Sequence, residues 1–323
     1  MGSQKANWQM NRIYSVLLGG TLTTMHIWSK SVQNPVLLFV HGGPGSPNRH
    51  HIANKLLPLS NRFTLVGYDE RGCGDSRIPT TFPLRIEDLA NQLRGVILYV
   101  KFLFPAAPLF VVGESFGSAL SLITLSTHSL PVDAYIGYGQ VAERRPLEIQ
   151  KGMLFLEELM KRGKTKDFEL WKKKLTSPSF PSSKAETNRY LAAYYDLLEK
   201  KDIPSFYERE ILPYQNSHEF SKKAKRNQGR DNAVGRNVLF HSLPDSFDPY
   251  LRLPMPVHIL AGEWDIVVPP SYQKSVYDRI EAPSKTMTIA KEAGHVVPFD
   301  NPKVFEDFLM NLVIGCRETK KLS

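Results

Sequence analysis

The chain has 323 residues, of which 42% are hydrophobic, and this content excludes an intrinsically disordered protein. The formal net charge of +9 comes from basic residues spread along the sequence without an aromatic-interleaved array. We therefore expect a solvated basic surface and no nucleic-acid partner. No apolar run reaches the roughly 18 residues that a membrane span needs, and the N-terminus lacks the apolar segment of a signal peptide, so we expect no membrane association.

The chain contains two cysteines, Cys73 and Cys316, which lie far apart in segments of internal character. Such a pair does not form a disulfide framework, and few cysteines of this kind favour a reducing compartment. We therefore expect a cytoplasmic protein. The sequence gives no indication of the oligomeric state.

The first part of the chain alternates predicted strands with predicted helices. A hairpin is expected around Gly19-Gly20, between the strand-like segments 13–18 and 21–28. Continuous apolar runs follow at 35–40, 62–68, 109–112 and 134–138, and helical patterns cover 86–104 and 118–129. Strands that are apolar on both faces belong to parallel sheets covered by helices, so this order predicts an α/β fold.

A helical insertion then interrupts the alternation. The stretch 141–251 is rich in Lys, Glu, Tyr and Leu at helical spacing, and strand character returns afterwards. The later strands are expected at 257–261 and 285–289, and the later helices at 270–281 and 301–313. We therefore predict a core of residues 1–140 and 252–323 with a mostly parallel central sheet. Residues 141–251 would form a helical cap, inserted after the sixth strand.

Four polar or glycine-rich motifs directly follow predicted strands. They are HGGPGSP at 41–47, GESFG at 113–117, GEWD at 262–265 and GHVVPFDNP at 294–302. The carboxyl ends of parallel strands share one edge of a sheet, and ligands of α/β proteins bind at that edge. The motifs are therefore expected to form one site.

Ser115 is the predicted nucleophile of this site. A tight turn from strand to helix would expose its hydroxyl, and the glycines on either side remove side chains that would clash there. A serine hydroxyl needs a base, and His295 could take its proton and pass it to the leaving group. Asp265 would orient that imidazole and stabilise its charged form.

Two backbone N–H groups are expected to bind the oxyanion that forms during acyl transfer. One belongs to Phe116, which follows the nucleophile, and the other to Gly43 in the loop after the strand at 35–40. His41 is expected to hold this loop by a side-chain hydrogen bond.

Structural interpretations exist for each of these residues. His295 could be an ordinary loop histidine, Asp265 could cap the helix predicted to begin at Pro270, and the glycines of HGGPG could form a plain turn. Their order along the chain, each after a predicted strand, favours catalysis. We expect no cofactor and no metal, because nucleotide-binding glycine motifs and HExxH are missing and His50-His51 are adjacent.

The motifs HGGPGSP, YDERGCGDS at 68–76, GESFGS, GEWD and AGH closely resemble those of the prolyl iminopeptidase-like family of α/β hydrolases. The resemblance extends from about Val36 to the C-terminus and is weaker in the insertion. It implies the α/β-hydrolase fold and a serine hydrolase whose archetypes release N-terminal proline or another residue from small peptides. It also implies the triad Ser115, Asp265 and His295, oxyanion donors at Gly43 and Phe116, and no cofactor.

Several positions depart from the pattern of that family. The elbow carries Glu114 and Phe116 where small and larger aromatic residues are usual, Glu70 replaces a usual glutamine, and Ile266 stands where some relatives carry an acid. The archetypes bind the substrate's amino group with acidic residues, usually from the cap. The candidates for that role here are Glu143, Glu148 and Glu219, with Glu114 and Glu70 nearer the nucleophile, and each has the alternative of an ordinary carboxylate.

The substrate is expected to be a short peptide or another small molecule, because a cap would close the site into a pocket. The aromatic residues that could line this pocket, or pack in a core, are Tyr190, Tyr194, Tyr195 and Phe206. Without an amine anchor, the same triad would serve an esterase, lactonase or amidase. A non-catalytic ligand-binding protein is a third alternative, which the complete triad pattern disfavours.

Overall fold

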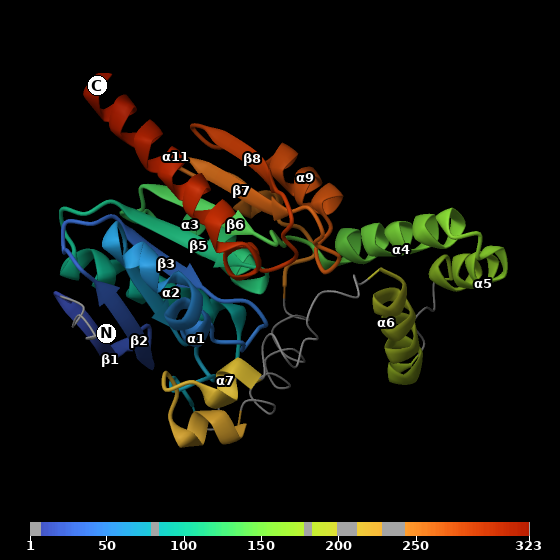
Figure 1. Cartoon of the computed structure of the whole chain (residues 1–323), viewed down its shortest axis with the longest axis horizontal. Coiled ribbons are helices and arrows are strands. Elements are labelled where there is room, and N and C mark those ends of the chain that lie inside the picture. Colours follow the sequence, from blue (N-terminus) through green and yellow to red (C-terminus); the bar gives the residue numbers. More distant parts are fainter. Residues whose placement is uncertain (1–7, 79–83, 178–182, 199–211, 228–242, 323) are drawn as a thin grey trace, which may run out of the picture.

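The computed structural model describes residues 8–78, 84–177, 183–198, 212–227 and 243–322. Its centre is an eight-stranded sheet with the strand order β1-β2-β4-β3-β5-β6-β7-β8 (Figure 1). The strands are β1 (Met10–Leu18), β2 (Thr21–Ser29), β3 (Val36–Val40), β4 (Thr64–Tyr68), β5 (Leu109–Glu114), β6 (Ala134–Tyr138), β7 (Val257–Gly262) and β8 (Lys285–Ala290). Strands β1, β2 and β4 pair antiparallel and all the other pairs are parallel. The predicted α/β fold with a mostly parallel central sheet is confirmed.

The predicted hairpin forms the first edge of the sheet. Leu18 pairs with Thr21, so the connection contains only Gly19 and Gly20, with φ angles of 52° and 75°. A two-residue turn of this kind requires positive φ at both central positions, which glycine adopts without steric cost.

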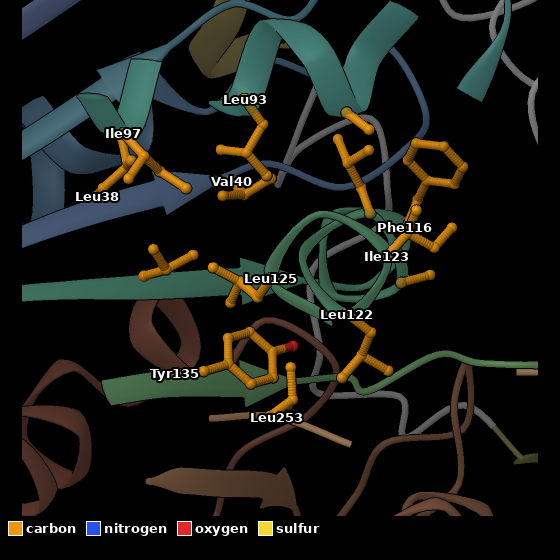
Figure 2. Packing of buried hydrophobic residues seen from close by; sticks show 14 of the residues in the cluster. Leu38, Val40, Leu93, Ile97, Phe116, Leu122, Ile123, Leu125, Tyr135 and Leu253 are labelled. Carbon is orange, nitrogen blue, oxygen red and sulfur yellow. The ribbon is translucent and has the colours of Figure 1, made fainter. Parts of the chain in front are cut away.

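Helices cover both faces of the sheet. The helices with a long apolar face are α2 (Ile86–Leu103), α3 (Phe116–Thr127), α9 (Pro270–Arg279) and α11 (Pro302–Leu322). Residues of α2, α3 and α9 belong to one apolar cluster, and residues of α11 belong to a second cluster on the opposite face. Strand β3 contributes residues to both clusters. Leu38 and Val40 belong to the first, and Leu37 and Phe39 belong to the second. Figure 2 shows part of the first cluster.

Short helical segments complete the core. They are α1 (Arg49–His51), η1 (Ile52–Leu56), η2 (Leu57–Asn61), η5 (Asp248–Tyr250) and α10 (Val297–Asp300). Helix α3 begins at Phe116, two residues before the predicted start, because the turn at Ser115 leads directly into it. Helix α11 ends at Leu322 and not at the predicted residue 313. Within the described part of the chain, no helix combines the length and the apolar character needed to cross a bilayer.

Helices follow β6 where the sequence predicts an insertion. They are α4 (Arg144–Lys161), α5 (Thr165–Leu175), α6 (Lys184–Leu198) and α7 (Leu212–Asn216), and β7 begins after them. Helices α4, α5 and α6 extend away from the sheet, whereas α7 lies beside the core (Figure 1). Phe155, Trp171, Tyr190 and Tyr194 from α4, α5 and α6 form an aromatic cluster of their own. Phe206, a predicted pocket residue, lies outside the described residues.

Candidate active site

Ser115 lies in a tight turn between β5 and α3. Its φ and ψ angles are 48° and −118°, which a non-glycine residue adopts only under local constraint. The flanking glycines make the turn possible. A Cβ atom on Gly113 would lie 2.8 Å from the Ser118 Cα, and one on Gly117 would collide with the carbonyl oxygens of Val40 and His41. The sequence GESFG therefore folds into the strained strand-to-helix turn that its pattern predicts.

His295 and Asp265 meet at the same edge of the sheet. The His295 Nδ1–H donates a hydrogen bond of 2.9 Å to the Asp265 Oδ2. The Asp265 Oδ1 accepts the backbone N–H groups of Val267 and Val268 at 2.9 and 2.8 Å. Gln273 Nε2 donates to the Oδ2 at 3.1 Å. These donors fix the orientation of the carboxylate, and the carboxylate in turn fixes the tautomer of the imidazole.

The His295 ring lies next to the turn that carries Ser115. The Ser115 backbone N–H donates to the Tyr138 carbonyl oxygen at 3.0 Å. The next residue, Gly139, has a φ angle of 54°, and a Cβ atom there would lie 2.6 Å from the His295 Cε1. The ring thus packs directly on a glycine that is one residue away from the backbone partner of Ser115. The structure therefore joins His295 to Asp265 and places the His295 ring beside the strand end that binds the Ser115 backbone.

Opposing effects act on the pKa of His295. Burial lowers it, but the charge of Asp265 and the hydrogen bond to it raise the pKa, and Glu114 and Asp300 add to this through their charges. The net result is a pKa above the ordinary value of 6.5. The imidazolium that forms when a base accepts a proton is therefore stabilised at this position.

The loop after β3 passes beside the predicted nucleophile. A Cβ atom on Gly42 would lie 3.0 Å from the Ser115 Cβ, and the following Gly43 has a φ angle of 116°. His41 holds this loop, because its Nδ1–H donates to the Gly42 carbonyl at 3.0 Å and its Nε2 accepts the Glu70 N–H at 3.1 Å. Burial lowers the pKa of His41 to about 4, so the ring is neutral. The expected hydrogen-bonding role of His41 is confirmed.

Two of the predicted amine anchors are bound to basic side chains of the protein. Glu143 is buried, forms an ion pair of 2.6 Å with Arg279 and accepts the Phe247 N–H at 2.8 Å. Glu219 lies 2.6 Å from the His26 Nδ1 and 3.8 Å from Arg49. These contacts argue for a structural role of both carboxylates in place of the predicted binding of a substrate amine.

Three candidates remain, of which Glu70 and Glu114 are buried in the core and Glu148 is not. Glu148 is exposed on α4, and its charge adds to burial in raising the pKa values of Tyr190 and Tyr194. The Tyr194 hydroxyl donates to the Ile266 carbonyl at 2.7 Å, which connects α6 to the loop of Asp265. Glu114 is buried directly before Ser115, so it is the candidate closest to the predicted nucleophile.

Some residues of the site lie outside the motifs that the sequence singles out. Asn48 and Tyr138 donate hydrogen bonds to the Glu114 Oε2 at 2.9 and 2.8 Å, and Gln273 supports Asp265. One feature of the sequence could have pointed to Gly139. It follows the predicted strand at 134–138, whose carboxyl end lies at the same edge of the sheet as the other motifs. The described residues include no group of three or more His, Cys, Asp or Glu side chains that could hold a metal ion.

Comparisons with known proteins agree with this architecture. The chain is 24% identical over 308 residues to a probable aminopeptidase, YbaC, of Bacillus subtilis (strain 168), covering 90% of this chain and 93% of that protein. It is 36% identical over 90 residues to a proline iminopeptidase of Levilactobacillus brevis, covering 28% and 29% of the two chains. An esterase from Exiguobacterium antarcticum shares the fold, with a TM-score of 0.56, 16% identity, and 94% and 99% of the two chains covered.

The resemblance to prolyl iminopeptidase-like enzymes is thus confirmed by named relatives, and the sheet order and the helices on both faces agree with it. The sequence profile described as alpha/beta hydrolase fold matches residues 35–302, which include every strand from β3 to β8. The chain therefore belongs to the α/β-hydrolase fold family.

Proposed function

We propose that this protein is a serine hydrolase that releases an N-terminal residue, proline or another, from short peptides. The observation that carries the proposal is the hydrogen bond of 2.9 Å between His295 and Asp265, with the imidazole packed on Gly139 beside the turn of Ser115. A nucleophile, a base and a group that orients the base are the three parts that acyl transfer by serine requires.

In the proposed reaction, the Ser115 Oγ attacks the carbonyl carbon next to the N-terminal residue. The His295 Nε2 takes the hydroxyl proton, because the Nδ1–H is bound to Asp265. The negative oxygen of the tetrahedral intermediate is bound by the N–H groups of Gly43 and Phe116. His295 then gives the proton to the leaving amine, and the C–N bond breaks. Water hydrolyses the resulting ester of Ser115 by the same steps in reverse order.

Named relatives and two carboxylates support an aminopeptidase. Relatives in sequence include a probable aminopeptidase and a proline iminopeptidase. Glu148 on α4 and Glu114 beside Ser115 are the candidates for binding the substrate's ammonium group. Residues 141–251 are proposed as the cap of this site, which would restrict it to small substrates.

The alternative is an esterase, lactonase or amidase that uses the same three residues. The observation that favours it is that Glu143 pairs with Arg279 and that Glu219 binds His26 and lies 3.8 Å from Arg49, which argues against both as amine anchors. An esterase needs no such anchor, because its substrates carry no free α-amine.

The test compares aryl amides of proline, alanine and leucine, with free and with acetylated amino groups, against short aryl esters. We expect turnover of the amides only with a free amino group, and a loss of at least about 10³-fold in kcat for Ser115→Ala. Ser126→Ala, which removes a hydroxyl from the far end of the same helix α3, is the control and should keep the activity. Ester turnover alone would establish the alternative, and turnover that survives Ser115→Ala would refute both.

A further inference from the structure

Two buried carboxyl groups lie beside the loop that follows β3. The Glu114 Oε1 lies 3.1 Å from the place that a Cβ atom on Gly42 would occupy, and a Glu70 oxygen lies 3.7 Å from the His41 Nδ1. Glu70 is 1% exposed and Glu114 is 9% exposed. Glu70 stands where the resembled family usually has glutamine, and Glu114 where it more often has a small residue, so this pair distinguishes the chain from that pattern.

The hydrogen bonds of the two carboxyl groups differ. Glu114 accepts the Asn48 amide and the Tyr138 hydroxyl, two neutral donors that stabilise a carboxylate. The oxygens of Glu70 accept no hydrogen bond of standard geometry, although the Gly45 N–H points toward them. Within the described part of the chain, no hydrogen bond of comparable strength therefore stabilises a negative charge on Glu70.

The surroundings of Glu70 disfavour its ionised form. Burial raises the pKa of Glu70 well above its ordinary value, and the charges of Glu114 and Asp69 raise it further. Among the described residues, the other titratable groups that face the pair are His295, whose pKa the charge of Glu114 helps to raise, His41, which burial keeps neutral, Tyr68, Cys73, and Arg49, which is bound to Asp69 at 2.8 and 2.7 Å. Two neighbouring buried carboxyl groups in such a place hold one proton between them.

We propose that Glu70 and Glu114 form a pair with a single proton, which resides on Glu70, and that the charge on Glu114 stabilises the His295 imidazolium. The second part rests on the proposed function. In this second part, Glu70 and Glu114 are positioning residues that do not contact the reacting atoms. A neutral Glu70 keeps a second negative charge away from the loop whose N–H group receives the oxyanion, while Glu114 assists the step in which His295 holds the Ser115 proton.

The first readout locates the proton without any substrate. In enzyme labelled with ¹³C at glutamate side-chain carboxyls, we expect one resonance with the shift of a protonated carboxyl at pH 7. That resonance should vanish in Glu70→Gln and remain in Glu114→Gln. Glu281→Gln, in an exposed ion pair with Arg252, is the control and should leave it unchanged. A protonated resonance that belongs to Glu114, or no protonated resonance at pH 7, overturns the proposal.

The second readout follows His295. Removing the negative charge in Glu114→Gln should lower the pKa of His295, so its ¹³Cε1 titration and the acidic limb of kcat/KM should both move to lower pH. In Glu70→Gln the His295 titration should stay in place, because a neutral carboxyl is replaced by a neutral amide. An unmoved titration in folded Glu114→Gln overturns the proposal. If the titration moves but no serine-dependent turnover exists, the proposed function fails and the carboxyl pair stands.

Discussion

Gly139 determines where the imidazole of His295 can lie. Its Cα faces the ring so closely that a methyl group would stand 2.6 Å from the Cε1. We predict that Gly139→Ala displaces the ring by a fraction of an ångström to about 1 Å and lowers kcat on the order of 100-fold, because catalytic groups tolerate little misplacement. The measurement is kcat on the best substrate of the amide and ester panel, with the thermal midpoint recorded for each variant.

The matched control is Gly163→Ala. Gly163 also has a positive φ angle, 66°, but no atom lies within 4 Å of its missing Cβ. Both variants carry the same kind of backbone strain, so a loss of activity in both would mean that strain and not the contact with His295 is responsible.

Also at the scale of residues, the sequence predicts which residues lie at strand ends, but it does not predict which side chains hydrogen-bond to them. Ser115, Asp265 and His295 could be named because each follows an apolar run, and parallel strands deliver such residues to one edge. Asn48 and Tyr138 could not, since their hydrogen bonds to Glu114 join residues 66 and 24 positions apart and depend on packing. For the same reason, the sequence does not predict the ion pair of Glu143 with Arg279, which is 136 positions away.

Among the elements, the segment 212–227 depends on a buried arginine of α1. Arg49 is fully buried, binds Asp69 through two nitrogens and donates to the Glu219 carbonyl at 2.6 Å. The Phe220 ring lies 4.4 Å from its guanidinium carbon, and the Glu219 side chain binds His26. Glu219 and Phe220 are therefore two neighbouring residues that hold this segment to the core.

We predict that Glu219→Gln raises the hydrogen-exchange rates of residues 212–227 and leaves those of β3, β5 and β6 unchanged. The variant removes the negative charge of a mostly buried side chain that binds His26. The loss of this contact should lower the local stability by about 1–3 kcal/mol. Asp278→Asn, which breaks an exposed ion pair with Lys274 on α9, is the control and should change little. Equal exchange in the variant and the wild type would show that the ion pair does not hold the segment.

The elements themselves could be predicted where apolar runs are continuous, as in β3 and β5. The end of α11 could not be predicted, because the apolar pattern stops near residue 313. The helix continues to Leu322 through residues such as Arg, Glu and Lys, which have a high helix propensity.

At the scale of the whole molecule, the aromatic cluster of α4, α5 and α6 is separate from the two clusters of the sheet. We predict that Phe155→Ala, which removes its buried centre at a cost of about 3–5 kcal/mol, unfolds these helices below the temperature at which the sheet melts. Hydrogen exchange along a thermal series should show two transitions.

The comparison variant is Phe110→Ala, which removes a buried side chain from β5. It should lower the transition of the sheet itself. A single transition in Phe155→Ala, shared by helices and sheet, would show that the two parts unfold as one unit. The spacing of apolar residues predicts that these helices exist, but the sequence does not show how strongly they pack against the core.

The insertion between β6 and β7 also has a consequence for synthesis. Ser115 precedes Asp265 by 150 residues and His295 by 180 residues in the chain. At the usual rates of translation, roughly 10 to 40 s separate the serine from its histidine. During that time a nascent chain can form the first six strands and the turn of Ser115, but it has neither the proposed base, His295, nor Asp265, which is proposed to orient it. If the proposed mechanism holds, a product cut short within the helices is inert, and hydrolysis begins only when synthesis has passed β8.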